Sequence, residues 1–414
     1  MIVELINKGE AYRPYRLRYI FCKKGNVMNN HWVLIDTAND IYLDKFQNIS
    51  SYSDTILLRN PRYSMKRLRG GISDGIDVVT IDNGRTCFEV LPTRGFSIYK
   101  IKCGNIELKW DSPNIRPVHP AFVPIADPTG LGWLEGFTEW LVRCGLESNG
   151  APDFDQNGKL LYPIHGRIAN IPADFVELNE ELDAKTITLS GKVFETKLFT
   201  KKFELHTSLI TQFDSTKFTI KDTITNLSAE PKEFELLYHI NTGQPFASPN
   251  GRVVVPFDRL VPQTETAAEN LPEWDKLGAE TVGSNEVVFY FEPAIGDDGL
   301  CKSMLINAAG DRAVVLSFSR DVLPYFILWK SRLANADGYV CGLEPAINFP
   351  NTRSFEKQQG RVGKLNPSES KTFELNFEIL ENSEAVKQTE HELKKINTKN
   401  KIESKPIKEW SPIN

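Results

Sequence analysis

The chain has 414 residues, of which 41% are hydrophobic, so it can bury a substantial core as one large domain or two ordinary ones. Its 49 basic and 54 acidic residues give a net charge of −5, which argues against nucleic-acid or membrane partners and favours a small, neutral or weakly charged one. The six cysteines form no CxxC pair, and a basic leader and a long apolar run are both lacking, so we expect a cytoplasmic protein without a disulfide framework or metal site.

Short apolar or alternating runs, broken by Gly, Asn, Asp and Pro, dominate the chain from residue 76 onward. In residues 217–224, for example, Phe218, Ile220 and Ile224 fall on one face of a strand. Runs of this kind occupy residues 76–81, 86–91, 96–102, 186–189, 203–213, 217–224, 234–238, 287–291, 313–318, 325–329 and 372–379. Many strands with few helices predict an all-β fold, a large antiparallel β-sandwich.

Residues 130–145 are the clearest exception. Five apolar side chains in this segment recur at helical spacing and would share one face of a helix: Trp133, Phe137, Trp140, Leu141 and Cys144. The pattern predicts a short helix or helical turn across the mouth of the sandwich, although glycines in the segment disfavour it.

The two ends of the chain differ from the middle. Residues 1–60 are less patterned, and we expect an extension that packs on a sandwich domain of residues 61–382. Residues 383–414 are rich in Lys, Glu, Asn and Thr, which predicts a short amphipathic helix followed by a mobile, charged tail.

Two polar side chains follow strand-like runs that are far apart in the sequence. His239 comes directly after residues 234–238 and Glu344 directly after residues 338–343, and loop-forming Pro, Gly and Asn residues follow each. A carboxyl at the end of a buried strand is partly desolvated, which raises its pKa toward the range of a general base. The two residues are therefore a candidate acid–base couple.

Structural roles compete with this interpretation. A histidine in this setting is structural about as often as functional, and Glu344 could form a salt bridge with Arg353 or Lys330. Asn241 shares the strand face of His239, and planar polar groups of this kind hold sugars.

A second histidine lies in a polar turn. In extended backbone His165 and Arg167 would point to the same side, so an imidazole and a guanidinium would converge on one patch that suits hydroxyl or carboxylate recognition. The alternative is a histidine that only hydrogen-bonds a neighbouring loop.

Six segments, taken in order, resemble the galactose mutarotase-like, or aldose 1-epimerase, superfamily, and in particular its uncharacterised bacterial branch. They are LPTRGFS (91–97), WDSP (110–113), WLVRCGL (140–146), IHGRIANIPA (164–173), LYHIN (237–241) and GLEP (342–345). Each segment is weak evidence alone, but the six in this order span most of the chain.

The resemblance implies a β-supersandwich and a cofactor-independent reaction on a carbohydrate. His239 would be the general acid that protonates the ring oxygen, Glu344 the general base that takes the proton of the anomeric hydroxyl, and His165 would bind sugar hydroxyls. Further candidates for the sugar pocket, chosen by position and chemistry, are Arg94, Arg143, Arg167, Asn241 and Lys330.

The sequence also departs from the mutarotases. It carries His-Gly-Arg at 165–167 where they carry His-Gly-Gly, so the reaction class is expected to carry over while the sugar is not. The extra arginines favour an acidic or otherwise modified sugar. Two alternatives are a non-catalytic carbohydrate-binding protein with stacking tryptophans such as Trp133, Trp140 or Trp329, and a sugar isomerase or lyase that acts at another carbon.

Overall fold

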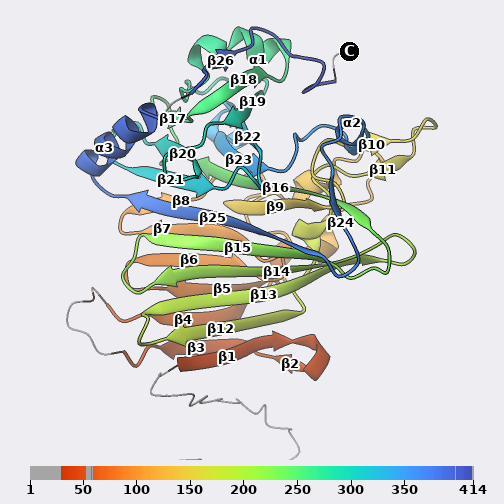
Figure 1. Cartoon of the computed structure of the whole chain (residues 1–414). Helices are drawn as coiled ribbons and strands as arrows, with labels where there is room; N and C mark the ends of the chain where they lie inside the picture. The colour runs from red at the N-terminus through yellow and green to blue at the C-terminus, as the bar shows by residue number, and fades with distance from the viewer. Residues whose placement is uncertain (1–28, 53–56, 58, 397, 413–414) are drawn as a thin grey trace, which may run out of the picture.

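The computed structural model describes residues 29–52, 57, 59–396 and 398–412, most of which lie in two large β-sheets (Figure 1). The ten-stranded sheet has the order β17 (Arg252–Val254), β20 (Cys301–Ile306), β21 (Ala313–Phe318), β25 (Ser370–Leu380), β15 (Lys217–Asn226), β14 (Lys201–Gln212), β13 (Thr186–Lys197), β12 (Phe175–Glu181), β1 (Asn29–Asp36) and β2 (Ile41–Tyr42).

The fourteen-stranded sheet has the order β26 (Lys401–Ile402), β18 (Phe257–Pro262), β19 (Val287–Pro293), β22 (Tyr325–Ser331), β23 (Val340–Ala346), β16 (Lys232–Gly243), β9 (Leu141–Leu146), β7 (Ser97–Cys103), β6 (Thr86–Leu91), β5 (Asp77–Asp82), β4 (Arg62–Arg67) and β3 (Lys45–Ile49), with β24 (Gly363–Leu365) beside β16 and β8 (Ile106–Leu108) beside β7. All pairs except β18 with β26 are antiparallel, so the predicted all-β, antiparallel sandwich is confirmed.

The α-helices of the described residues are few and short. They are α1 (Glu265–Glu269), α2 (Arg353–Gln358) and α3 (Ser383–Lys394), and a small hairpin of β10 (Asp153–Phe154) and β11 (Leu160–Tyr162) stands apart from the sheets. In the described part of the chain, no helix has the length and apolar character needed to cross a membrane.

The main core lies between the two sheets, where the inward side chains of each alternating strand meet. Phe218 of β15 stacks on Phe377 of β25 with ring centroids 4.7 Å apart, and its edge meets Phe88 of β6 in the other sheet at 5.0 Å. Burying each such ring contributes about 1.5–3 kcal/mol, which holds the sheets face to face.

The middle of the fourteen-stranded sheet is buried on both faces. Nearly every residue of β9, β16 and β23 is inaccessible, because loops cover the face that is turned away from the other sheet. A second aromatic cluster lies under these loops and includes Trp110, Trp133, Phe137, Tyr290 and Phe349. This covered face carries the candidate site.

The short helix or helical turn expected within residues 130–145 is found only in the first part of that segment. Only Gly132–Gly136 forms a 3₁₀ helix, and Leu141–Leu146 forms β9. A strand that is buried on both faces carries an unbroken apolar run, which fits a helical period as well as an extended one.

Both ends of the described chain pack on the sandwich. β1 pairs with β12 at one edge of the ten-stranded sheet, and β3 pairs with β4 at the edge of the other. The helix predicted near residue 384 is α3, whereas the segment after it, for which we expected a mobile tail, adds β26 beside β18 and buries Trp410.

Candidate active site

His239 and Glu344 face each other on two neighbouring antiparallel strands. In the register of β16 and β23, Leu237 lies opposite Ala346 and Ile240 opposite Leu343, which places His239 directly opposite Glu344. The two side chains therefore share the covered face of the sheet. Their exposed fractions are 4% and 2%.

The imidazole of His239 is fixed in orientation. Nε2 lies 3.2 Å from Oε1 of Glu344, and Nδ1 lies 2.5 Å from Oδ1 of Asn241. The amide of Asn241 donates to the backbone carbonyl of Glu139 at 3.0 Å, so its oxygen is the atom that is turned to the imidazole. Nδ1 must therefore carry a hydrogen, and Nε2 is the atom that can gain or lose a proton beside Glu344.

A glycine makes room for the carboxyl group. A Cβ at Gly342 would lie 2.5 Å from Oε1 of Glu344, closer than real Cβ atoms come, and 3.1 Å from the ring of Trp329, which is a tight contact. Oε1 has no hydrogen-bond partner among the described residues, because its contact with Nε2 lacks hydrogen-bond geometry. A buried oxygen of this kind is available to a ligand.

Burial favours the uncharged forms of both groups. Desolvation raises the pKa of Glu344 well above its usual value, with a smaller effect in the same direction from the Glu286 carboxylate. Desolvation, together with the neighbouring His165, lowers the pKa of His239. The pair consequently holds one transferable proton, on either Nε2 or the carboxyl group.

His165 joins this pair from a loop. Its ring centroid is 5.4 Å from that of His239 and 4.7 Å from that of Trp133, and its Nδ1 lies 2.8 Å from the carbonyl oxygen of Asn149. Because a carbonyl only accepts, Nδ1 is the donor and Nε2 presents a lone pair. Burial lowers the pKa of His165 to about 4, so this imidazole is neutral at physiological pH.

Aromatic rings surround His239. The centroids of Phe137 and Trp329 lie 5.0 and 5.1 Å from that of His239, and the indole of Trp329 donates to Glu286 at 2.7 Å. Trp133 and Trp329 were predicted only as stacking residues of a binding protein, and Phe137 was missed because its segment was interpreted as a helix. Trp140 lies instead in the main core, 5.4 Å from Phe377.

Two predicted pocket arginines are structural. Arg143 lies opposite Tyr238, on the face of β9 turned toward the ten-stranded sheet, where it donates to Asp222 at 2.9 Å and to Thr207 at 2.7 Å. Arg94 is fully buried and donates to Glu139 at 2.8 Å and to the carbonyl of Gly136, which braces the loop that carries Phe137.

The other two cations also lie outside the site. Lys330 points to the opposite face of β22 from Trp329, and its ammonium donates to three backbone carbonyls: Glu273, Trp274 and Lys276, at 3.0, 2.8 and 3.1 Å. Arg167 does not converge with His165, because His165 and Gly166 have φ of 56° and 70°, so the chain turns instead of extending. The arginines therefore do not support the expectation of an acidic sugar.

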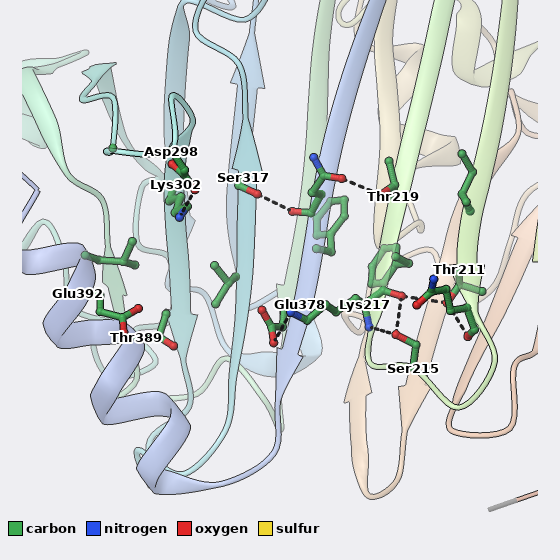
Figure 2. Close-up of a pocket in the computed structure, with 18 of the residues that line it drawn as sticks. Thr211, Ser215, Lys217, Thr219, Asp298, Lys302, Ser317, Glu378, Thr389 and Glu392 are labelled. Carbon is green, nitrogen blue, oxygen red and sulfur yellow. Dashed lines mark hydrogen bonds and ion pairs between the residues drawn. The ribbon is translucent and has the colours of Figure 1, made fainter. Parts of the chain in front are cut away.

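A separate groove lies on the face of the ten-stranded sheet that is turned away from the fourteen-stranded sheet. Its volume is about 750 Å³, and Figure 2 shows it between α3 and the strands β14, β15 and β25, lined by polar residues such as Thr219, Ser317 and Lys217. It contains none of the predicted site residues. Among the described residues, no group of three or more His, Cys, Asp or Glu is placed to hold a metal ion.

Comparison with known proteins agrees with this architecture. Residues 73–379 match the family described as "Domain of unknown function (DUF4432)". A crystal structure described as a "putative aldose 1-epimerase" from Klebsiella pneumoniae is 30% identical with a TM-score of 0.86, and the match covers 90% of this chain and 97% of that one. A galactose mutarotase-like protein from Clostridium acetobutylicum shares the fold at 17% identity and a TM-score of 0.52, covering 82% of this chain and 99% of that one. No curated protein matches the chain.

Proposed function

The chain belongs to the DUF4432 family within the galactose mutarotase-like superfamily, and from this premise we propose that it is an aldose 1-epimerase-type isomerase. It would interconvert the anomers of a free or modified sugar by acid–base catalysis. The observation that carries the proposal is the buried contact between His239 Nε2 and Glu344 Oε1, with Nδ1 fixed by Asn241.

The proposed reaction needs only the one proton that this pair holds. With a cyclic sugar bound and the proton on Nε2, Glu344 takes the proton of the anomeric hydroxyl while His239 protonates the ring oxygen. The bond between C1 and the ring oxygen breaks and C1 becomes a carbonyl carbon. Rotation about the C1–C2 bond and the reverse transfers then close the ring with the opposite configuration.

The geometry of the pair suits these two oxygens. Both the ring oxygen and the anomeric oxygen are bonded to C1, so a sugar lying over the pair can present one to each group. The uncharged pair favoured by burial is the state that ring opening leaves behind, with the proton on Glu344. The protein would thus stabilise the open-chain stage of the reaction.

Neighbouring groups would hold the sugar. The Nε2 lone pair of His165 can accept a hydrogen bond from a hydroxyl, and the indole nitrogen of Trp133, buried without a partner among the described residues, can donate one. Phe137 and Trp329 offer apolar surfaces on which a sugar ring can pack.

The test measures anomerisation of a panel of aldoses by polarimetry or NMR saturation transfer. Replacing the acid or the base, as His239→Gln or Glu344→Gln, should lower the rate by about 10²–10⁴-fold. His206→Gln, on the exposed side of β14, is the matched control and should retain the full rate. Undiminished catalysis in a His239→Ala, Glu344→Gln double variant would refute the assignment, and sugar affinity without any acceleration would favour a binding protein.

A further inference from the structure

A buried carboxyl group that takes no part in the proposed proton transfer lies on the same strand as His239. Glu235 of β16 is inaccessible to solvent, and each of its oxygens accepts one hydrogen bond. Oε2 accepts from the backbone N–H of Asn149 at 2.9 Å, and Oε1 accepts from the side-chain amide of Asn348 at 2.8 Å. Both partners are donors, so these two hydrogen bonds favour the ionised form of the carboxyl group.

A single residue connects this carboxylate to His165. The N–H of Asn149 binds Glu235, and the carbonyl oxygen of Asn149 accepts from Nδ1 of His165 at 2.8 Å. The side chain of Asn149 also donates to Asn348 at 2.7 Å, so Glu235 and Asn348 together clamp this residue. The backbone N–H of His165 donates to the carbonyl of Gly150, the residue after Asn149, at 2.9 Å.

We propose that ionised Glu235 is a positioning residue that holds His165 in its sugar-binding orientation through Asn149, and that protonation of Glu235 releases it. Protonation removes the negative charge that strengthens both accepted hydrogen bonds, so the bonds from Asn149 and Asn348 weaken. The clamp on Asn149 loosens, and the imidazole that depends on its carbonyl loses its fixed orientation. The consequence for catalysis rests on the proposed function, whereas the structural link does not.

The surroundings place this change near neutral pH. Burial raises the pKa of Glu235 to about 7; Arg353 of α2 and the two donors oppose the rise, and Glu356 of α2 adds to it. Arg353 also donates a hydrogen bond to Glu233 at 3.1 Å. Above neutral pH the clamp is therefore closed, and below it the clamp opens.

The experiment follows the ¹⁵N imidazole signals of His165 between pH 5.5 and 8.5, in the full chain and in Glu235→Gln, and assigns them with His165→Gln. In the unsubstituted protein these signals should move with a midpoint near pH 7, although the pKa of His165 itself is about 4. Glu235→Gln should abolish this movement. Asn348→Ala removes a donor that favours the charged form, so it should shift the midpoint to higher pH.

Sugar binding should change in parallel. In the unsubstituted protein, KM should rise about fivefold at pH values below the NMR midpoint, with little change in kcat. In Glu235→Gln, KM should be high at every pH. Glu374→Gln, which changes an exposed glutamate of β25 in the other sheet, is the control and should keep both profiles. Signals of His165 that respond to pH identically with and without Glu235 would overturn the proposal. If no sugar is anomerised, the proposed function fails while the NMR signals still decide the link between Glu235 and His165.

Discussion

At the residue scale, the site depends on which nitrogen of His239 carries its fixed hydrogen. Asn241 decides this, because its oxygen accepts from Nδ1 and leaves Nε2 to exchange a proton beside Glu344. In the proposed mechanism, a residue that fixes the tautomer of the general acid contributes to the rate without transferring a proton itself.

Asn241 should therefore matter even though it transfers no proton. Asn241→Ala frees the imidazole to adopt either tautomer and should lower kcat/KM by about 10–100-fold. Asn241→Asp keeps an acceptor toward Nδ1 and should retain more activity than the alanine variant, while it raises the pKa of His239 and shifts the pH profile upward. Equal losses in the two variants, measured by polarimetry across pH, would mean that Asn241 acts only by filling space.

At the element scale, the last described segment closes the far end of the fourteen-stranded sheet. Trp410 packs on Phe349 and Tyr325 with centroid distances of 4.7 and 6.2 Å, and the guanidinium of Arg259 lies 5.1 Å from its ring. Its carbonyl accepts from the side chain of Asn351 at 2.8 Å. The segment therefore belongs to the aromatic cluster that also contains Phe137 and Trp133.

Removing this ring should destabilise the whole fold. Trp410→Ala deletes a large buried side chain and should lower the free energy of unfolding by about 3–5 kcal/mol, as measured by urea denaturation. Ile402→Ala, which trims a half-exposed side chain of β26, should change it by less than about 0.5 kcal/mol. A small effect of Trp410→Ala would show that the segment merely lies on the surface.

At the scale of the whole molecule, buried carboxyls and buried imidazoles give stability opposite dependences on pH. The pKa of Glu235 is raised from 4.5 to about 7, so its contribution is complete below pH 4.5 and is lost as pH rises through 7. The pKa of His165 is lowered from 6.5 to about 4, so its contribution is complete above pH 6.5 and is lost as pH falls through 4. The two effects, each about 3 kcal/mol, oppose each other over almost the same range.

Replacing one of the two groups should leave the pH dependence of stability that is due to the other. In Glu235→Gln the free energy of unfolding should rise from pH 4.5 to 7, because the effect of His165 is no longer opposed. In His165→Gln it should fall over the same interval. Urea denaturation at several pH values measures both slopes, and slopes of the same sign in the two variants would contradict these assignments.

The sequence by itself determined the fold class, and it singled out the pair for which we propose the proton transfers. Alternating runs such as residues 217–224 state directly which side chains enter a core, and strand ends followed by loop residues mark His239 and Glu344. The order of short motifs was enough to name the superfamily, which the structural comparison confirms. These features are local, so they can be read along the chain.

Only the tertiary structure decided which polar residues share a face with that pair. In strands buried on both sides, neighbouring positions look equally apolar, so Arg143 and Lys330 were assigned to the sugar pocket although the pleat turns them away. The turn at His165 and Gly166 separated Arg167 from its expected partner, and the link from Glu235 through Asn149 to His165 joins residues far apart in sequence. Contacts of this kind depend on strand register and loop packing, which a single sequence does not specify.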